Sequence, residues 1–230
     1  MTTTPATPPF TREALEIVFE KSNFKSFQKT GYRSHYWAPL ISACSGTRRN
    51  DILYLTPDDV LQQDGIWFMR IKAHDAKTVG SGSVIRDIPI HPTLQRLGFL
   101  EFVEERRRTH PNERLFSEYK ASQNHAGMVF SRAFVHWIKM TVRTLPDEKK
   151  RLFDADFHFP SLRALFSVEA LRSQKEASAC RQNFGISNGF QRTLDEDLAQ
   201  DDFEKADIEM RRMDLESYLP MLYTYEELMA

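Results

Sequence analysis

Residues 37–52, WAPLISACSGTRRNDI, constrain the fold of this chain more than any other stretch. An apolar run that predicts a buried helix ends in a turn of small residues around Gly46, and Arg48 and Arg49 follow directly. An arginine at the end of a buried helix is costly unless it meets an anion, and its planar guanidinium suits two-point contact with a phosphate or carboxylate. The alternative interpretation is an arginine that caps the preceding helix or pairs with a nearby acid such as Asp51. Both interpretations stay open on these residues alone.

The composition is that of an ordinary globular protein. The chain has 230 residues, of which 41% are hydrophobic and 27% charged, enough for one large domain or one domain with appendages. It contains no apolar run long enough to span a bilayer and no basic-then-apolar export signal at its N-terminus. Cys44 and Cys180 lie in apolar helical patterns and are expected to be reduced core residues. These features predict a cytoplasmic protein without a disulfide framework, a metal site or another cofactor.

The charges are unevenly distributed along a nearly neutral chain. The formal net charge of −1 counts mildly against a high-affinity DNA binder. However, residues 1–192 carry most of the arginines and lysines, whereas residues 194–209, LDEDLAQDDFEKADIE, are markedly acidic. Near-neutrality is therefore compatible with a basic face together with an acidic segment.

The hydrophobic periodicity predicts an α+β fold that is mainly α-helical with a small three-stranded antiparallel sheet. A Thr/Pro-rich lead-in over residues 1–9 precedes a helix capped by Thr11. The three arginines at 106–108 are expected to end a helix on its solvated surface. The expected helices cover 32–43, 50–54, 92–108, 126–145, 160–172, 176–183 and 203–218, and the expected strands lie at 65–71, 76–78 and 84–90.

A set of short motifs, in order and at characteristic separations, resembles the catalytic domain of the tyrosine recombinases, or phage-type integrases. The resemblance runs from about Phe10 to Ser187 and so covers most of the chain. Each motif is weak by itself, and the family signal comes from their order and spacing. The motifs are Tyr36–Leu40, Gly46–Ile52, Lys77–Thr78, Ile88–Pro92, Leu97–Leu100, Arg114–Phe116, Phe130–Arg132 and Ser161–Arg163.

The resemblance implies a specific chemistry at a DNA phosphodiester. In the family a tyrosine attacks the phosphorus and forms a 3′-phosphotyrosyl link, while two arginines bind the non-bridging oxygens and a lysine protonates the leaving oxygen. By position, Arg48 and Arg163 match the two arginines, and Lys77 matches the lysine. Asp51 stands where the family has a glutamate that supports the first arginine. No metal is implied, because the arginines supply the positive charge.

The same resemblance also shows what this chain lacks. Pro160 occupies the position of a histidine three residues before Arg163, and His158 is a low-ranked replacement because it lies five residues ahead. Ile186 stands where a second histidine is expected. No tyrosine occurs between Tyr119 and Tyr218, so the nucleophile and both histidines are expected to be missing.

Two further interpretations concern residues other than the matched site positions. Tyr218, Tyr223 and Tyr225 are candidates for a displaced nucleophile, but packing of the C-terminal segment onto the domain or a neighbouring subunit is favoured. Arg86 and Arg132 are expected to be surface or DNA-backbone arginines and not catalytic groups. The side chains of Arg48, Lys77 and Arg163 are interpreted as a phosphate-binding group, with ordinary salt bridges as the alternative.

The sequence therefore predicts three segments and two classes of function. The segments are a flexible leader over 1–9, an integrase-like catalytic domain over 10–193, and an acidic segment with a C-terminal helix or tail over 194–230. The first class is a recombinase-like protein that binds double-stranded DNA and has impaired or no strand cleavage. The second is a non-enzymatic interaction or structural domain that retains the integrase fold. Self-association through the C-terminal tail is an expected additional property, and no membrane contact is expected.

Overall fold

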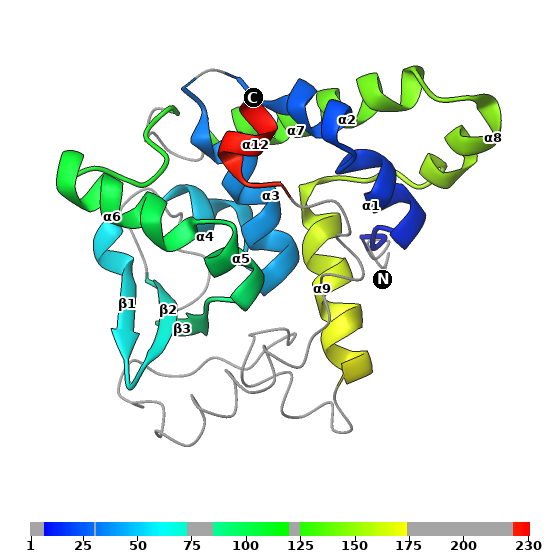
Figure 1. Ribbon diagram of the computed structural model, residues 1–230. Coiled ribbons are helices and arrows are strands. Elements are labelled where there is room, and N and C mark those ends of the chain that lie inside the picture. Colours follow the sequence, from blue (N-terminus) through cyan, green and yellow to red (C-terminus); the bar gives the residue numbers. More distant parts are fainter. Residues whose placement is uncertain (1–6, 30, 73–84, 120–124, 174–222) are drawn as a thin grey trace.

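The computed structural model describes residues 7–29, 31–72, 85–119, 125–173 and 223–230. In this part of the chain, helices make up most of the structure and a small antiparallel sheet lies at one edge (Figure 1), which confirms the predicted fold class. The elements are α1 (Arg12–Val18), α2 (Lys21–Phe27), α3 (Arg33–Ser45), α4 (Arg49–Leu53), η1 (Pro57–Asp59), β1 (Val60–Gln63), β2 (Ile66–Ile71), β3 (Arg86–Pro89), α5 (Pro92–Arg96), α6 (Phe99–Thr109), α7 (His125–Arg143), α8 (Asp147–Lys150), η2 (Arg151–Phe153), α9 (Phe159–Ser173) and α12 (Tyr225–Met229).

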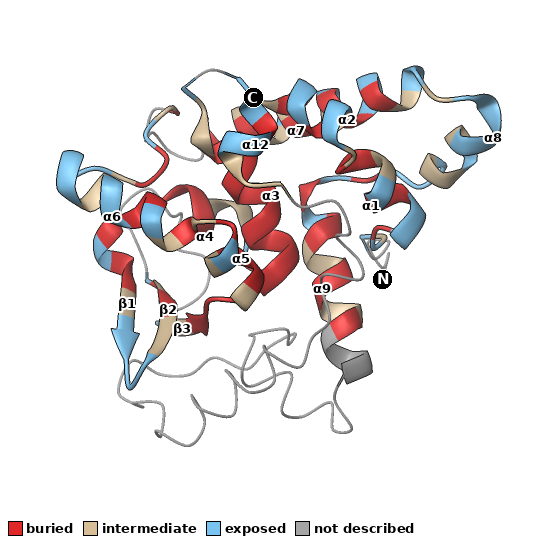
Figure 2. Cartoon of the chain, viewed as in Figure 1, coloured by how far each residue is buried: buried red, intermediate tan, exposed pale blue. Residues whose placement is uncertain are grey.

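Helix α3 is the centre of the molecule. Every residue from Ser34 to Ser45 is buried, and Figure 2 shows the helix in the buried colour along its length. Such all-round burial follows from a sequence that is apolar on most sides. Pro39 lies inside the helix and has no N–H to donate to the His35 carbonyl. The Gln28 side chain compensates, because its amide nitrogen lies 3.4 Å from that carbonyl oxygen.

The helix α2 was not predicted from the sequence. It packs through aromatic side chains, with the Phe27 ring stacked on the Trp137 ring of α7 at a centroid separation of 4.5 Å. The Trp137 indole N–H also donates to the Asn23 carbonyl at 2.8 Å. The N-cap of α2 is Glu20, whose carboxylate accepts a hydrogen bond from the backbone N–H of Ser22 at 3.0 Å. Only two apolar residues face the core, Phe24 and Phe27, which explains why the periodicity was too short to identify.

The sheet has the order β1-β2-β3, and both pairs are antiparallel. The predicted strands at 65–71 and 84–90 correspond to β2 and β3. The first strand of the described sheet is β1, which the sequence did not predict, whereas the predicted strand at 76–78 lies outside the described residues. An Asp64-Gly65 turn with positive φ at both positions joins β1 to β2, as tight hairpins of matching twist require.

The helix predicted over residues 92–108 is wrong as a single element. It is two helices, α5 and α6, because Gly98 between them adopts a left-handed conformation with φ of 89°. Two arginines of α6 also correct the expectation of a solvated basic end. Arg107 donates to the carbonyls of Pro57 and Val60 at 2.6 and 2.9 Å, and Arg106 donates to the Arg114 carbonyl at 2.9 Å. These hydrogen bonds of Arg106 and Arg107 connect α6 to neighbouring segments of the chain.

Helix α9 and the C-terminal α12 complete the described structure. Helix α9 lies alongside α3 (Figure 1). Helix α12 rests on its own chain, against α2 and the first half of α3, with Leu228 fully buried. The predicted helices at 176–183 and 203–218, together with Cys180, lie outside the described residues. Cys44 is buried, and no disulfide is formed by it in the described structure. Across the described ranges, no helix is both long and apolar enough to cross a bilayer.

Candidate functional site

The turn after α3 is fixed by its own small polar side chains. The Ser42 hydroxyl donates to the Thr47 carbonyl at 3.2 Å, and the Ser45 hydroxyl donates to the Ile41 carbonyl at 2.6 Å. The Ser45 and Thr47 hydroxyl oxygens are 2.6 Å apart. These contacts are buried, so the direction in which the chain leaves α3 is well determined.

Gly46 brings this turn against α9. It ends α3 in a left-handed conformation with φ of 64°, and its N–H donates to the Ser42 carbonyl at 2.9 Å. A Cβ at this position would lie 2.6 Å from a ring carbon of Phe166. Phe166 is fully buried on α9, three residues after Arg163. Close contact at Gly46 therefore places the arginine turn beside the part of α9 that carries Arg163.

The two consecutive arginines of the turn have different roles. The Arg49 side chain donates to the Asn50 carboxamide oxygen at 3.1 Å and to the Ser131 hydroxyl, so it joins α4 to α7. Burial lowers the pKa of the Arg49 guanidinium. Arg48 is exposed and precedes α4 as its N-cap residue. Of this pair, Arg48 is the side chain that an external anion can reach.

Arg86 on β3 forms an ion pair with Asp51 on α4. Its terminal nitrogen lies 2.9 Å from the Asp51 carboxylate, and the aspartate side chain is only 1% exposed. Burial lowers the pKa of the Arg86 guanidinium; the Asp51 carboxylate acts in the opposite direction and the positive charge of Arg48 in the same direction. The acid that is expected to support Arg48 thus forms an ion pair with Arg86.

Arg163 belongs to the same electrostatic neighbourhood. The pKa of its guanidinium is lowered to about 10, first by burial and then by the positive charges of Arg48 and Arg86, while the Asp51 carboxylate acts in the opposite direction. A guanidinium with this pKa remains protonated at neutral pH. Three side chains from the α3–α4 turn, β3 and α9 therefore place their positive charges close enough to perturb one another.

This cluster favours an anion. Three guanidiniums, those of Arg48, Arg86 and Arg163, influence one another beside the carboxylate of Asp51. Positive charges held together and partly removed from water repel one another, and a bound anion relieves that repulsion. A phosphate presents several oxygens to such a cluster and suits guanidinium forks. Among the described residues, no group of His, Cys, Asp or Glu is arranged to hold a metal ion.

The remaining predicted site residues are Lys77 and His158. Lys77 lies outside the described residues. His158 is exposed and its backbone caps α9, because its N–H donates to the Ser161 hydroxyl at 3.1 Å and its carbonyl accepts from the Ser161 N–H at 2.8 Å. No described hydrogen bond joins the His158 ring to the arginine cluster. Its assignment as a replacement histidine stays a prediction.

Two candidate tyrosines are held at the opposite end of α3. The Tyr225 ring lies 3.9 Å from the Arg33 guanidinium and 5.4 Å from the Tyr36 ring. The Tyr36 hydroxyl donates to the Tyr223 carbonyl. Helix α3 extends for about 18 Å between Arg33 and its last residue, which precedes the arginine turn. In this arrangement Tyr223 and Tyr225 are remote from the cluster, and Tyr218 lies outside the described residues.

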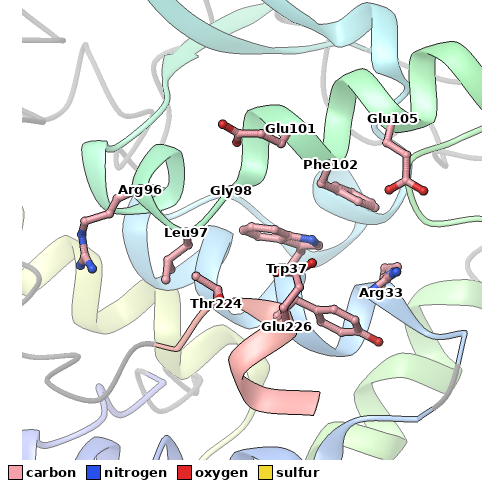
Figure 3. A pocket seen from close by; sticks show the side chains of 11 residues that line it. Arg33, Trp37, Arg96, Leu97, Gly98, Glu101, Phe102, Glu105, Thr224 and Glu226 are labelled. Carbon is pink, nitrogen blue, oxygen red and sulfur yellow. The ribbon is translucent and has the colours of Figure 1, made fainter. Parts of the chain in front are cut away.

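A cavity of about 330 Å³ lies where α12 rests on the domain. Figure 3 shows Glu226 of α12 and its N-cap residue Thr224 on one side and Trp37 of α3 with Phe102 of α6 on the other. The Trp37 and Phe102 rings are stacked with centroids 5.7 Å apart. The cavity is a feature of the tail contact and is separate from the arginine cluster.

Arg86 is the site residue that the sequence did not identify as part of the cluster. In a strand, residues two apart face the same side, so Arg86 shares a side with Ile88. Ile88 is 2% exposed, and Ile71, which pairs with Arg86 across the sheet, is also 2% exposed. The alternation in the sequence therefore contained a signal that Arg86 faces inward. The opposite side carries Asp87, which forms two hydrogen bonds with Arg70.

Comparisons with known proteins give one informative result. No protein-family model and no curated protein sequence matches the chain. One solved structure that resembles it is the XerH site-specific recombinase bound to a palindromic difH substrate in a post-cleavage complex. The match has a TM-score of 0.50 and 14% sequence identity, and it covers 79% of this chain and 47% of the XerH chain. This chain therefore spans about half of the recombinase it resembles. Because the identity is so low, the similarity concerns the fold: the protein has a tyrosine-recombinase-like catalytic-domain fold.

Proposed function

We propose that this protein is a recombinase-like domain that binds the phosphate backbone of double-stranded DNA through Arg48, Arg86 and Arg163, with little or no strand cleavage. The observation that carries the proposal is the mutual electrostatic influence of these three arginines around Asp51. The fold supports it, because the structurally similar XerH is a site-specific recombinase bound to its DNA substrate. The segments proposed within the chain remain 1–9, 10–193 and 194–230.

The proposed loss of cleavage follows from the missing nucleophile. The two-step mechanism implied by the resemblance begins with attack by a tyrosine hydroxyl, and no other step provides an entry to the covalent intermediate. Tyr223 and Tyr225 are held beside α2 and α3 by contacts at the far end of α3. Ile186, which stands at the second histidine position, has no group that can transfer a proton. Each missing acid–base partner would cost a further ~10²–10⁴-fold in rate.

The DNA-binding part is tested by fluorescence anisotropy with a labelled 30-base-pair duplex over a salt series. A phosphate-backbone binder should lose affinity steeply with salt, because counterions are released from the DNA. Arg48→Gln should weaken binding and reduce the slope of log affinity against log salt by about 1, since one phosphate contact is lost. Arg108→Gln is the matched control, because Arg108 is also an exposed arginine but lies on α6, away from the cluster. Equal effects of the two changes would contradict the proposal.

The cleavage part is tested with a nicked suicide substrate that traps covalent protein–DNA adducts. We expect no adduct on a denaturing gel. An adduct that disappears in Tyr218→Phe, Tyr223→Phe or Tyr225→Phe would identify a working nucleophile and overturn this half of the proposal.

A second candidate function is a non-enzymatic interaction or structural domain that retains the fold. The near-neutral net charge of −1 favours this candidate. It predicts no DNA affinity at 50 mM salt and no effect of Arg48→Gln in the binding assay, so the same experiment separates the two functions.

A further inference from the structure

Helix α7 presents an apolar seam to a groove at the end of the molecule remote from the sheet. The seam consists of Val135, Ile138 and Val142, which line a cavity of about 500 Å³. The other wall is formed by Phe153 and Phe157, from η2 and the loop before α9. Figure 1 shows this end of α7, next to α8, on the opposite side of the molecule from the strands.

The spacing of the seam suits a second helix. Its residues are separated by three and then four positions, which is the spacing by which one helix packs along another. The inner face of α7, with Phe130, Phe134 and Trp137, is already buried in the core. The seam lies one position further round: Ile138 at its centre is buried, whereas Val135 and Val142 on either side of it are half-buried.

Cations flank the seam along its outer side. Each seam residue is followed directly by His136, Lys139 or Arg143, all three exposed, and Arg132 continues the row one turn earlier. Asp156 is the carboxylate among the groove-lining residues. Met140 is also exposed, at 44%, and flexible thioether side chains at a surface adapt to many apolar partners. The rim of the groove is thus basic while its floor is apolar.

We infer that this groove binds an acidic amphipathic helix of a partner protein, whose apolar residues fill the seam and whose carboxylates face Lys139 and Arg143. Two observations support a protein helix over nucleic acid: the floor is apolar and concave, and the seam has the periodicity of helix packing. The groove is also separate from the arginine cluster. Arg49 contacts Ser131 in the second turn of α7, whereas the seam begins at Val135 and ends with the helix. The inference is independent of the proposed DNA binding.

The test uses a labelled 16-residue peptide with leucines at three-four spacing and glutamates at most other positions. A scrambled peptide of the same composition removes the periodicity. We expect the first peptide to bind the full chain with a Kd on the order of tens of micromolar, as for a small transient interface, and the scrambled peptide to bind at least tenfold more weakly.

Charge reversal identifies the site. Lys139→Glu combined with Arg143→Glu should weaken peptide binding at least tenfold, and a peptide with lysines in place of glutamates should then bind the reversed protein. Both residues are exposed, so an unchanged unfolding curve establishes that the variant is folded. Arg108→Glu, an exposed reversal on α6, is the matched control and should leave peptide binding unchanged.

Three results would overturn the inference. The first is absence of peptide binding up to 500 µM, or equal binding of the scrambled peptide. The second is a loss of affinity for a 30-base-pair duplex in the reversed variant with no loss for the peptide, which would make the basic row a nucleic-acid contact. The third is a concentration-dependent dimer of the unmodified protein, detected by sedimentation, that the reversal abolishes, because the groove would then pair two copies of this chain.

Discussion

At the scale of single residues, Gly46 controls the geometry of the cluster because it satisfies two requirements at once. Its φ of 64° strains any side chain, and a Cβ would meet the Phe166 ring at 2.6 Å. Gly46→Ala should therefore lower the free energy of unfolding by about 2–4 kcal/mol, combining the strain of the backbone with overpacking. Urea denaturation measures this change.

Gly65→Ala separates the two effects. Gly65 has a similar positive φ of 82°, but a Cβ there would meet no atom within 4 Å. Gly65→Ala should therefore lower the free energy of unfolding only through backbone strain, by about 1–2 kcal/mol. If both variants lose the same stability, the contact with Phe166 does not fix the turn against α9.

The ion pair of Arg86 with Asp51 gives a second prediction at this scale. Arg86→Gln removes the ion pair that Arg86 forms with a nearly fully buried carboxylate and should cost about 3–5 kcal/mol of stability. The double variant, with Asp51→Asn added, should recover part of that loss because the buried charge is gone. A double-mutant cycle from denaturation curves measures the coupling, and a coupling near zero would show that the pair is not an energetic unit.

The predictability of the site also differs from residue to residue. Arg48 and Arg163 were identified by motif, and the structure brings their charges together. From the sequence, Arg86 is expected to be a surface or DNA-backbone arginine and not a catalytic group. Only the cross-strand register, which pairs it with buried Ile71, decides that it faces Asp51. Contacts set by tertiary register are not available from local pattern.

At the scale of elements, long periodic segments were predictable and short ones were not. The buried α3 and the amphipathic α7 were found within a few residues of their ends. The sequence predicts α5 and α6 as one helix because the apolar spacing continues across Gly98. The φ of 89° at Gly98, which separates the two helices, depends on the tertiary structure and not on the local pattern. Strand β1 was missed because only Val60 of its four residues is buried.

The junction between α2 and α3 predicts a pH dependence. The His35 ring is buried, with Nδ1 at 2.6 Å from the Phe27 carbonyl and Nε2 at 2.6 Å from the Tyr119 hydroxyl. Burial lowers the pKa of His35, so the unfolded chain binds a proton that the folded one resists. Stability should therefore be fully present above the unfolded value near 6.5 and fall as the pH drops towards the folded pKa.

The measurement is the urea midpoint between pH 7.5 and 5. The unmodified protein should lose stability over this window by more than His35→Gln does, because the glutamine cannot be protonated. His35→Gln should have a lower free energy of unfolding than the unmodified protein at pH 7.5, because it loses the contacts of the buried imidazole ring. Parallel curves for the two proteins would show that another group determines the acid response.

At the scale of the whole molecule, the question is whether the C-terminal α12 belongs to the same cooperative unit as the domain. Leu228, two residues before the last residue Ala230, is fully buried, whereas its neighbour Met229 is 37% exposed. If α12 unfolds together with the body, Leu228→Ala should cost about 2–4 kcal/mol in global unfolding, while Met229→Ala should cost under about 0.5 kcal/mol. If α12 detaches alone, both variants should unfold like the unmodified protein.

We expect the cooperative outcome, because α12 is tied to the body by several kinds of contact. Tyr36 donates a hydrogen bond to the Tyr223 carbonyl, and Arg33 stacks on the Tyr225 ring. Leu228→Ala also tests whether the two ends of α3 act independently. Since α12 and the arginine cluster lie at opposite ends of α3, which is about 18 Å long, Leu228→Ala should leave DNA affinity unchanged under conditions where the variant is folded. A parallel loss of stability and DNA affinity in the folded variant would mean that the docked tail itself takes part in binding, and the tail would then join the candidate site.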